Sequence, residues 1–251
     1  MSRRAVRISP VTTEAQFARP SSTVVLVRDA VNAPEVFMVR RHRKSSFGTS
    51  YAFPGGVLER FDHDVHDLCA GVSSAVADCL LGVDGIGLDY FSCAIRELFE
   101  EAGVLLGQTQ RSIDELGDAR KQLNDGSLSW DRFAADNKLV LHCDQLQYFS
   151  YWITPESEPK RYSTRFFLAE MPAGQHAYHD GGELTESCWM SAEDVLQACK
   201  KGEMTLIYPT RKTLERIAQL ESTSALREWA RSCGEAGVVC NQPAFAPESV
   251  Q

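Results

Sequence analysis

The eight residues from Arg96 to Gly103 constrain the fold of this chain more than any other stretch of the sequence. Read as a helix at 100° per residue, the octet and the residue before it gather their apolar side chains within an arc of about 100°. These side chains belong to Ile95, Leu98, Phe99 and Ala102. Gly103 stands where a helix ends through a left-handed residue. The stretch therefore predicts the C-terminal half of a core-facing helix, which we expect to run from about Tyr90 to Ala102.

Three acids occupy the opposite side of the same predicted helix. Glu97, Glu100 and Glu101 follow the i, i+3 and i+4 spacing, so their carboxylates lie close together and repel one another. A hard divalent cation such as Mg²⁺ or Mn²⁺ would remove this repulsion, because such cations bind carboxylate oxygens. The alternative, for the octet taken alone, is a solvated acidic face.

Composition bounds the class of protein. A chain of 251 residues with 43% apolar and 24% charged residues can form one large globular domain or two small ones. The net charge of −8 argues against nucleic acid or an anionic membrane as the main partner. The eight cysteines are scattered, which points away from a zinc site or a disulfide framework and favours reduced thiols inside a cell. We therefore expect a cytoplasmic protein, and no apolar run is long enough to span a membrane.

The remaining patterns predict one α+β domain with helical inserts. A hairpin is expected from strands at 23–27 and 36–39, and further strands at 104–106, 146–154, 165–169 and 183–190. Helices are expected near 65–81, over 111–137 with a break at 124–126, and at 191–200, 210–220 and 224–232. We assign 1–21 to a flexible arm, 22–232 to the domain and 233–251 to a tail.

The glycine loop Phe53-Pro54-Gly55-Gly56 and the octet together resemble a known motif. With Asp62 they are similar to the Nudix box, G-x5-E-x7-R-E-U-x-E-E-x-G-U, in which U is a bulky aliphatic residue. The second half matches at every defined position, whereas Asp62 replaces the usual Glu and 33 residues, 63–95, replace the usual seven. A box interrupted in this way resembles the peroxisomal coenzyme A diphosphatase branch of the Nudix hydrolases and its bacterial relatives. The resemblance implies an α/β/α sandwich with a mixed sheet, carrying inserts at 63–90 and 111–137.

The resemblance also implies roles for particular residues. Divalent metal, Mg²⁺ or Mn²⁺, would be bound by Glu97, Glu100, Glu101 and the carbonyl of Gly56. Arg96 would hold these acids in place, with Asp62 as its structural partner. A later acid often serves as a further ligand or base, and Glu183 and Glu186 are the candidates. The implied catalytic set is therefore Arg96, Glu100, Glu101, Glu183 and Glu186.

The substrate implied by the resemblance is a small nucleoside diphosphate derivative, with coenzyme A or acyl-CoA favoured. Hydrolysis would give 3′,5′-ADP and 4′-phosphopantetheine, the latter acylated if the substrate is acyl-CoA. The alternatives are an ADP-ribose, NADH or dinucleotide pyrophosphatase, and a non-catalytic nucleotide-binding module. Candidate substrate contacts are Arg40, Arg41, Arg43, Tyr51 and Phe53, although the basic run could equally be an exposed hairpin end. We expect neither nucleic acid nor membrane as a partner, and the choice between monomer and homodimer stays open.

The run Asp62-His63-Asp64-Val65-His66-Asp67 offers a second set of potential metal ligands. It lacks the HxHxDH order of dinuclear metallohydrolases and falls within the insert. A polar loop leading into a helix is the favoured interpretation, with a second metal site as the alternative.

Overall fold

A mixed β-sheet forms the centre of the molecule. The computed structural model describes residues 17–41, 50–182 and 184–243. Its main sheet has the strand order β10-β2-β1-β9-β8-β11, with β3 added to β2 and β4 added to β1. The bounds are β1 Arg19–Arg28, β2 Glu35–Arg41, β3 Tyr51–Ala52, β4 Gly55–Val57, β8 Gln147–Ile153, β9 Tyr162–Glu170, β10 Leu184–Ser191 and β11 Cys240–Asn241. β1 pairs parallel with β9 and antiparallel with β2, which confirms the predicted hairpin.

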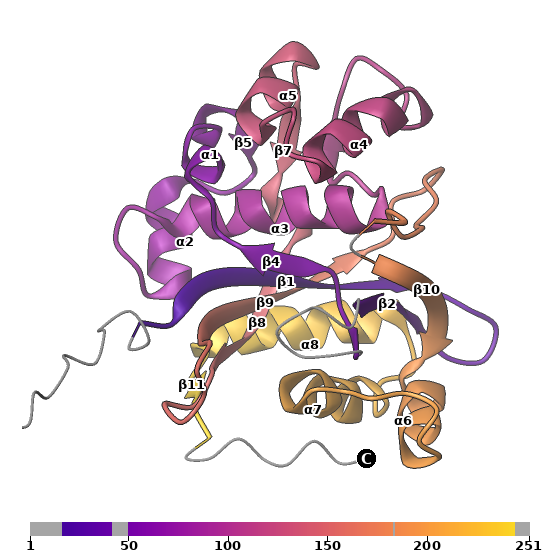
Figure 1. Ribbon diagram of the computed structural model, residues 1–251. Helices are drawn as coiled ribbons and strands as arrows, with labels where there is room; N and C mark the ends of the chain where they lie inside the picture. The colour runs from indigo at the N-terminus through magenta and orange to yellow at the C-terminus, as the bar shows by residue number, and fades with distance from the viewer. Residues whose placement is uncertain (1–16, 42–49, 183, 244–251) are drawn as a thin grey trace, which may run out of the picture.

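Helices cover both faces of this sheet, which confirms the α/β/α sandwich (Figure 1). The helix α3, Gly87–Ala102, crosses one face, and α6, α7 and α8 lie against the other. These three helices span Ala192–Lys200, Tyr208–Ile217 and Thr223–Ala236. The side chains of β1 alternate between the two faces: Val24 and Leu26 pack on the α3 side, and Val25 and Val27 on the other. Two separate hydrophobic cores result, one on each face of the sheet.

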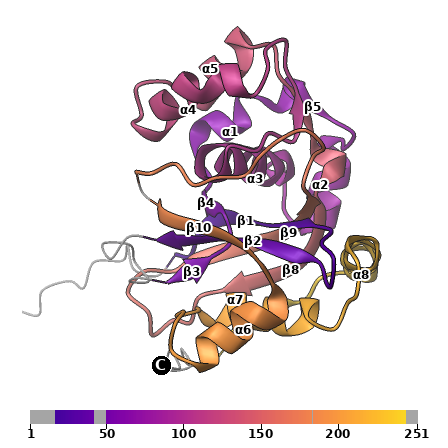
Figure 2. The same cartoon turned by 90° about the vertical axis from the view of Figure 1, so that its right-hand side faces the viewer.

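A further layer covers the outer side of α3 (Figure 2). It contains α1 Arg60–His63, α4 Gly117–Asn124 and α5 Trp130–Asp136, whereas α2 Ser74–Leu81 lies beside α3. A small sheet of order β5-β7-β6 joins these segments; its strands are Cys69–Ala70, Val140–His142 and Gly107–Gln108. Phe133 of α5 stacks on Phe99 of α3 with 5.2 Å between ring centroids. Both inserts therefore pack on the helix that carries the acidic octet.

Several predicted boundaries are wrong in detail. The helix expected near 65–81 exists only from Ser74, because residues 66–68 form a 3-10 turn and 69–70 form β5. Gly71, with a φ of 80°, lies against the Asp144 side chain and separates this strand from the helix. The strand expected at 104–106 is instead buried loop, and β6 follows it. The short β5 and β6 carry no periodicity that a sequence pattern can detect.

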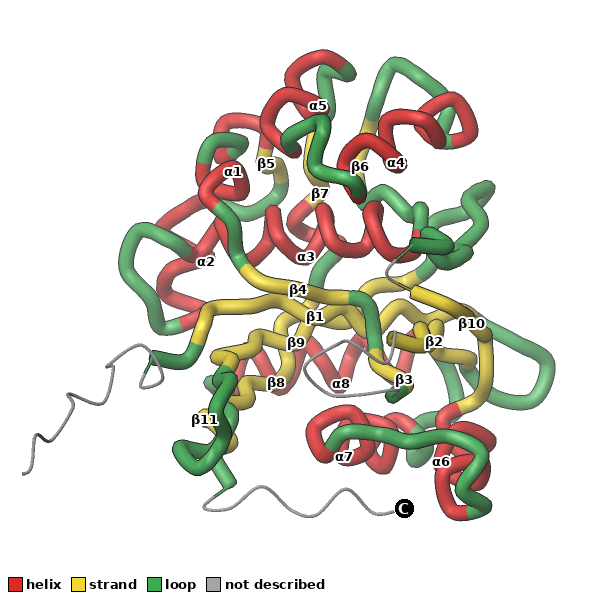
Figure 3. The backbone as a smooth tube through the Cα atoms, in the orientation of Figure 1, coloured by secondary structure: helices red, strands yellow, loops and turns green. Residues whose placement is uncertain are grey.

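Regular structure extends beyond the predicted ends of the domain on both sides. β1 begins at Arg19, so residues 19–21 belong to the sheet rather than to an arm. At the other end α8 continues to Ala236, and β11 pairs with β8, so residues 233–241 are not a free tail (Figure 3). Residues 1–16 and 244–251 lie outside the described residues. Within the described residues, no helix has the length and apolar character needed to cross a membrane.

Candidate active site

The acidic octet forms the C-terminal half of α3 and is covered rather than solvated. The apolar stripe of the helix is buried as predicted, and Gly103, with a φ of 71°, ends the helix by donating its N–H to carbonyls of the last turn. The acidic side is enclosed too, since Glu101 is only 7% exposed and the side chains of Glu97 and Glu100 are 12% and 16% exposed. The alternative of a solvated acidic face is therefore wrong.

Arg96 joins the acids of the cluster. Its Nε and Nη2 donate to Asp62 Oδ1 at 2.9 Å and Oδ2 at 3.0 Å, a bidentate pair inside the protein. Its Nη1 donates to Glu97 Oε1 at 2.6 Å and to Glu100 Oε2 at 3.1 Å. Nη2 also donates to the carbonyl of Val57 at 2.9 Å, which ties the guanidinium to β4. One side chain thus orients two of the proposed ligands.

Asp62, the predicted partner of Arg96, is fully buried at the end of α1. Its Oδ2 accepts the backbone N–H of Glu59 at 2.8 Å, which closes a capping box on this short helix. Its Oδ1 accepts the Ser92 hydroxyl at 3.3 Å, and the Trp130 indole N–H donates to that hydroxyl at 3.1 Å. The shorter side chain of Asp reaches Arg96 because α1 brings its backbone close to α3, so the expected pairing is formed.

The two glycines of β4 bring the backbone against the acidic side chains. The N–H of Gly55 donates to Glu101 Oε2 at 2.9 Å. A Cβ built on Gly56 would collide with the Glu97 carboxylate, so only glycine leaves room for that side chain. Glu97, Glu101 and the Gly56 backbone therefore meet in one place, as the motif requires.

Burial of several acids in one cluster shifts the pKa values of its members. Burial raises the pKa of Glu100 to about 7, with Glu97 acting in the same direction and Arg96 against it. Burial likewise raises the pKa of Asp62 against the opposing effect of Arg96. Although burial acts to lower it, the carboxylates of Glu97 and Asp62 hold the pKa of Arg96 well above its ordinary value. The arginine is therefore a permanent cation.

A second polar group lies at the sheet edge formed by β2, β3 and β10. Arg40 Nη1 donates to Glu186 Oε2 at 3.0 Å, and the Tyr51 hydroxyl is hydrogen-bonded to the same carboxylate. These two hydrogen bonds, that from Arg40 first, lower the pKa of Glu186. Burial and then Glu186 raise the pKa of Tyr51 to about 12. Three residues predicted from sequence are thus brought together, as one hydrogen-bonded group.

The other predicted substrate contacts do not join this hydrogen-bonded group in the described structure. Phe53 is 1% exposed and packs in the core beneath the sheet, so its assignment as a substrate contact is wrong. Its position beside the glycine loop reflects packing. The side chain of Arg41, together with Arg43 and Glu183, falls outside what the structure describes.

Two residues of the site were missed at the sequence level. Ser92 lies four positions before Arg96, so helical spacing alone places both on the face that meets Asp62. Arg120 of α4 donates to the carbonyls of Glu100 and Tyr178, each at 2.9 Å, and so holds the end of α3. No sequence pattern connects Arg120 to the octet, because the contact depends on how the second insert folds back.

The residues present fit a divalent cation. The carboxylates of Asp62, Glu97 and Glu100 contact the guanidinium of Arg96, and that of Glu101 accepts the Gly55 N–H nearby. Their donor atoms are all oxygens, the ligand type that Mg²⁺ and Mn²⁺ take, and Gly56 leaves its backbone open beside Glu97. Because Asp62 already neutralises Arg96, the remaining negative charge requires a cation or protons.

Comparisons with known proteins agree with this fold and motif. A Nudix hydrolase of Alicyclobacillus acidocaldarius, at 24% identity, superimposes with a TM-score of 0.70 over 85% of this chain and 96% of the other. The acyl-coenzyme A diphosphatase NUDT19 of Gallus gallus is 24% identical over 242 residues, covering 78% of this chain and 64% of the relative. The Homo sapiens protein of the same name is 29% identical over 153 residues, covering 55% and 41%. The chain thus spans less than two thirds of the length of either relative.

The family model described as the NUDT19 Nudix domain matches residues 86–217, that is 132 of the 251 residues of the chain. The match begins at the start of α3, includes the acidic octet and ends with α7, whereas the glycine loop and Asp62 precede it. The fold and this match define a Nudix hydrolase. The chain belongs to the NUDT19 Nudix domain family.

Proposed function

We propose that the chain hydrolyses the diphosphate bond of a nucleoside diphosphate-linked substrate with the help of Mg²⁺ or Mn²⁺. One observation carries the proposal: Glu97, Glu100 and Glu101 lie on one turn of α3 against Gly55 and Gly56. A divalent cation held by these residues would neutralise the charge of a diphosphate and would lower the pKa of a bound water. The cluster contains more acid than its one arginine balances, which suits such a cation.

The proposed ligands are Glu97, Glu100, Glu101 and the Gly56 carbonyl, and the protein fixes each carboxylate differently. Arg96 holds Glu97 and Glu100, and the Gly55 N–H holds Glu101. Asp62 anchors Arg96 without facing substrate, because it is fully buried. A site whose ligands are held in this way is organised before substrate arrives, which is what transition-state stabilisation requires.

Glu186 is proposed as the acid outside α3 that takes part in the reaction, with Glu183 as the neighbouring candidate. Arg40 and Tyr51 lower the pKa of Glu186, so its carboxylate is ionised at neutral pH and able to accept a proton. A low pKa also makes it a weak base, since the best general base titrates near the working pH. A change from Glu186 to Gln that lowers kcat and removes the acid limb of its pH profile would support this role.

For the substrate we favour coenzyme A or acyl-CoA. This choice is supported by the relatives, which are named acyl-coenzyme A diphosphatases, and by the interrupted box. In the reaction the water oxygen bonds to one phosphorus and the P–O bond of the bridging oxygen breaks. The products are 3′,5′-ADP and 4′-phosphopantetheine, which keeps the acyl group when the substrate is acyl-CoA. Arg40 is the described basic residue proposed to meet the substrate phosphates. The retained Arg96, Glu97, Glu100 and Glu101 argue against a module that only binds nucleotides.

A substrate panel tests the proposal. The purified chain is incubated with Mg²⁺ or Mn²⁺ and CoA, acetyl-CoA, NADH, ADP-ribose or Ap₄A, and the products are separated by chromatography. Release of 3′,5′-ADP from the CoA compounds alone is the expected result. Preferred cleavage of NADH or ADP-ribose would overturn the choice of substrate, and the absence of any cleavage would favour the binding module.

The cellular setting belongs to the same proposal. No disulfide joins the eight cysteines, all of which lie in the described part of the chain, and this favours a reducing compartment such as the cytoplasm. Cell fractionation with an antibody against the chain tests this location. A homodimer is the assembly to test, by light scattering of the purified chain.

A further inference from the structure

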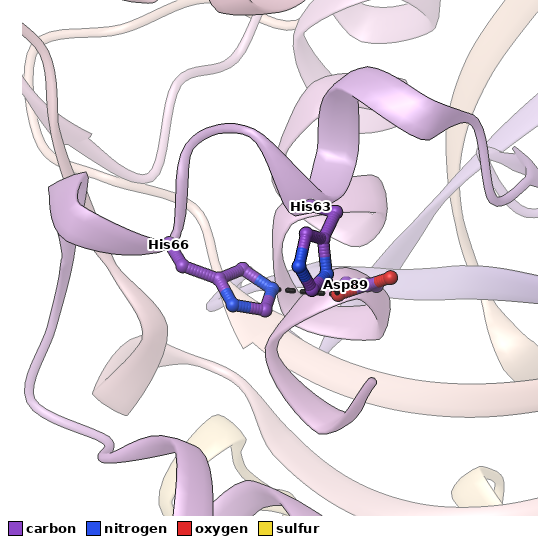
Figure 4. A group of neighbouring side chains, drawn as sticks. All are labelled: His63, His66 and Asp89. Atoms are coloured by element: carbon purple, nitrogen blue, oxygen red, sulfur yellow. Dashed lines mark hydrogen bonds and ion pairs between the residues drawn. The ribbon is translucent and has the colours of Figure 1, made fainter. Parts of the chain in front are cut away.

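Two histidines and an aspartate meet where α1 and the following turn lie against the first turn of α3 (Figure 4). His63 ends α1, His66 begins the following 3-10 turn, and Asp89 lies in the first turn of α3. His63 Nδ1 and His66 Nε2 both approach Asp89 Oδ1, at 3.1 Å and 2.6 Å. The potential ligand atoms of all three lie within 4.8 Å of one another. We propose that His63, His66 and Asp89 form a Zn²⁺ site separate from the candidate active site.

The backbone around these side chains holds them in place. Val65 lies between the two histidines and is 2% exposed in the core, so the segment that carries them is anchored to the protein. On the other side, Tyr90 and Phe91 follow Asp89 and are buried within α3. The three ligands therefore come from two rigid segments, and little ordering remains to be done when a metal binds.

The donor set selects the metal. Two imidazoles and a carboxylate suit Zn²⁺, which takes three protein ligands and a water in open sites, whereas the all-oxygen octet suits Mg²⁺ or Mn²⁺. With bonds of about 2.0–2.1 Å in a tetrahedron, neighbouring donors lie about 3.3 Å apart. The 3.1 Å between His63 Nδ1 and Asp89 Oδ1 is close to this value, and the 2.6 Å between His66 Nε2 and Asp89 Oδ1 would have to lengthen by roughly 0.7 Å on metal binding.

The three side chains of the site differ in their exposure to solvent. The side chain of His63 is 57% exposed, whereas those of His66 and Asp89 are 21% and 12% exposed. An ion can therefore enter past His63 and keep a water as its fourth ligand. Cysteine and histidine spacing did not indicate zinc, because Asp89 stands 23 positions after His66 and joins it only through the fold.

The proposed ion would fasten α1 to α3 next to Asp62. Asp62 precedes His63 directly, and it is the residue that holds Arg96. Zn²⁺ at this point would therefore stabilise the insert over α3 without touching substrate. The competing account is a plain hydrogen-bonded network in which Asp89 accepts from both imidazoles.

Metal binding to the whole chain separates these accounts. The protein is stripped with a chelator, Mg²⁺ is held in millimolar excess to occupy the octet, and Zn²⁺ is titrated. We expect one equivalent of Zn²⁺ to bind and the X-ray absorption spectrum of the bound zinc to show scattering from imidazole ligands. Binding should also raise the Tm of the protein. The variant His66→Gln should lose at least about 100-fold in Zn²⁺ affinity, given that even residues behind a ligand account for 10–100-fold. It should also lose the rise in Tm.

The matched control is His176→Gln, which removes an exposed histidine elsewhere and should bind Zn²⁺ as the unaltered chain does. If His66→Gln does not fold, as judged by circular dichroism, Asp89→Asn gives a second test, because Asn keeps the shape and an acceptor oxygen but loses the charge. Equal Zn²⁺ affinity in the unaltered chain and in the folded variant would overturn the proposal. Failure to bind Zn²⁺ in the presence of Mg²⁺ would overturn it too.

Discussion

Replacing Glu100 with Gln should stabilise the metal-free protein at alkaline pH while it removes activity. Burial raises the pKa of Glu100 from its ordinary 4.5 to about 7 in the folded chain. Between pH 4.5 and 7 the folded state therefore binds more protons than the unfolded state. The stabilisation that comes from protonation of Glu100 is complete below about pH 4.5 and is lost as the pH rises through 7. At about 1.4 kcal/mol for each pH unit, the loss is about 3 kcal/mol. Gln mimics the protonated acid and has no such loss.

Thermal unfolding in chelator, followed from pH 5 to pH 8, measures this effect. For a domain of this size, about 3 kcal/mol corresponds to a difference in Tm of about 6–12 °C between Glu100→Gln and the unaltered chain at pH 8, shrinking towards pH 5. The exposed Glu203 provides the matched control, since Glu203→Gln should follow the unaltered chain. The reasoning would be refuted if Glu100→Gln had the same Tm as the unaltered chain at pH 8, or if its gain in Tm were as large at pH 5 as at pH 8.

Three further changes test the packing of the site. Asp62→Ala leaves the buried Arg96 without its bidentate partner and should cost about 3–5 kcal/mol in unfolding free energy, measured by urea titration; a cost below 1 kcal/mol would contradict the pairing. Gly56→Ala should lower the rate roughly 10²-fold, because its Cβ collides with Glu97, whereas Gly117→Ala, which meets nothing within 4 Å, should match the unaltered chain in the same assay. Phe133→Ala should cost about 3–5 kcal/mol if the insert and α3 unfold together, and two separate calorimetric transitions would argue otherwise.

Local patterns predicted most of the elements that carry the site. The octet specifies a helix, its core stripe and its end at Gly103, because all three depend on residues within two turns of one another. Asp62 was assigned to Arg96 across 33 residues only through the resemblance to the Nudix box, and the two do pair. The hairpin of β1 and β2 followed from β-branched runs around a proline turn.

Contacts between distant segments account for what the sequence did not predict. The small sheet of β5, β6 and β7 consists of strands two or three residues long, which show no alternation of apolar and polar residues. Arg120 and Trp130 reach the site only because the second insert folds back on α3. Phe53 was misassigned because a residue beside a glycine loop can point into the core as readily as towards a ligand.

The rate of CoA hydrolysis as a function of Mg²⁺ concentration tests the central claim most directly. For the unaltered chain we expect no release of 3′,5′-ADP in chelator and a rise to saturation as Mg²⁺ is added. Glu97→Gln should lower the saturating rate or the Mg²⁺ affinity by roughly 10²-fold, because it removes a carboxylate that Arg96 holds against Gly56. Hydrolysis that persists in chelator, or a Glu97→Gln variant with an unchanged Mg²⁺ curve, would contradict the account.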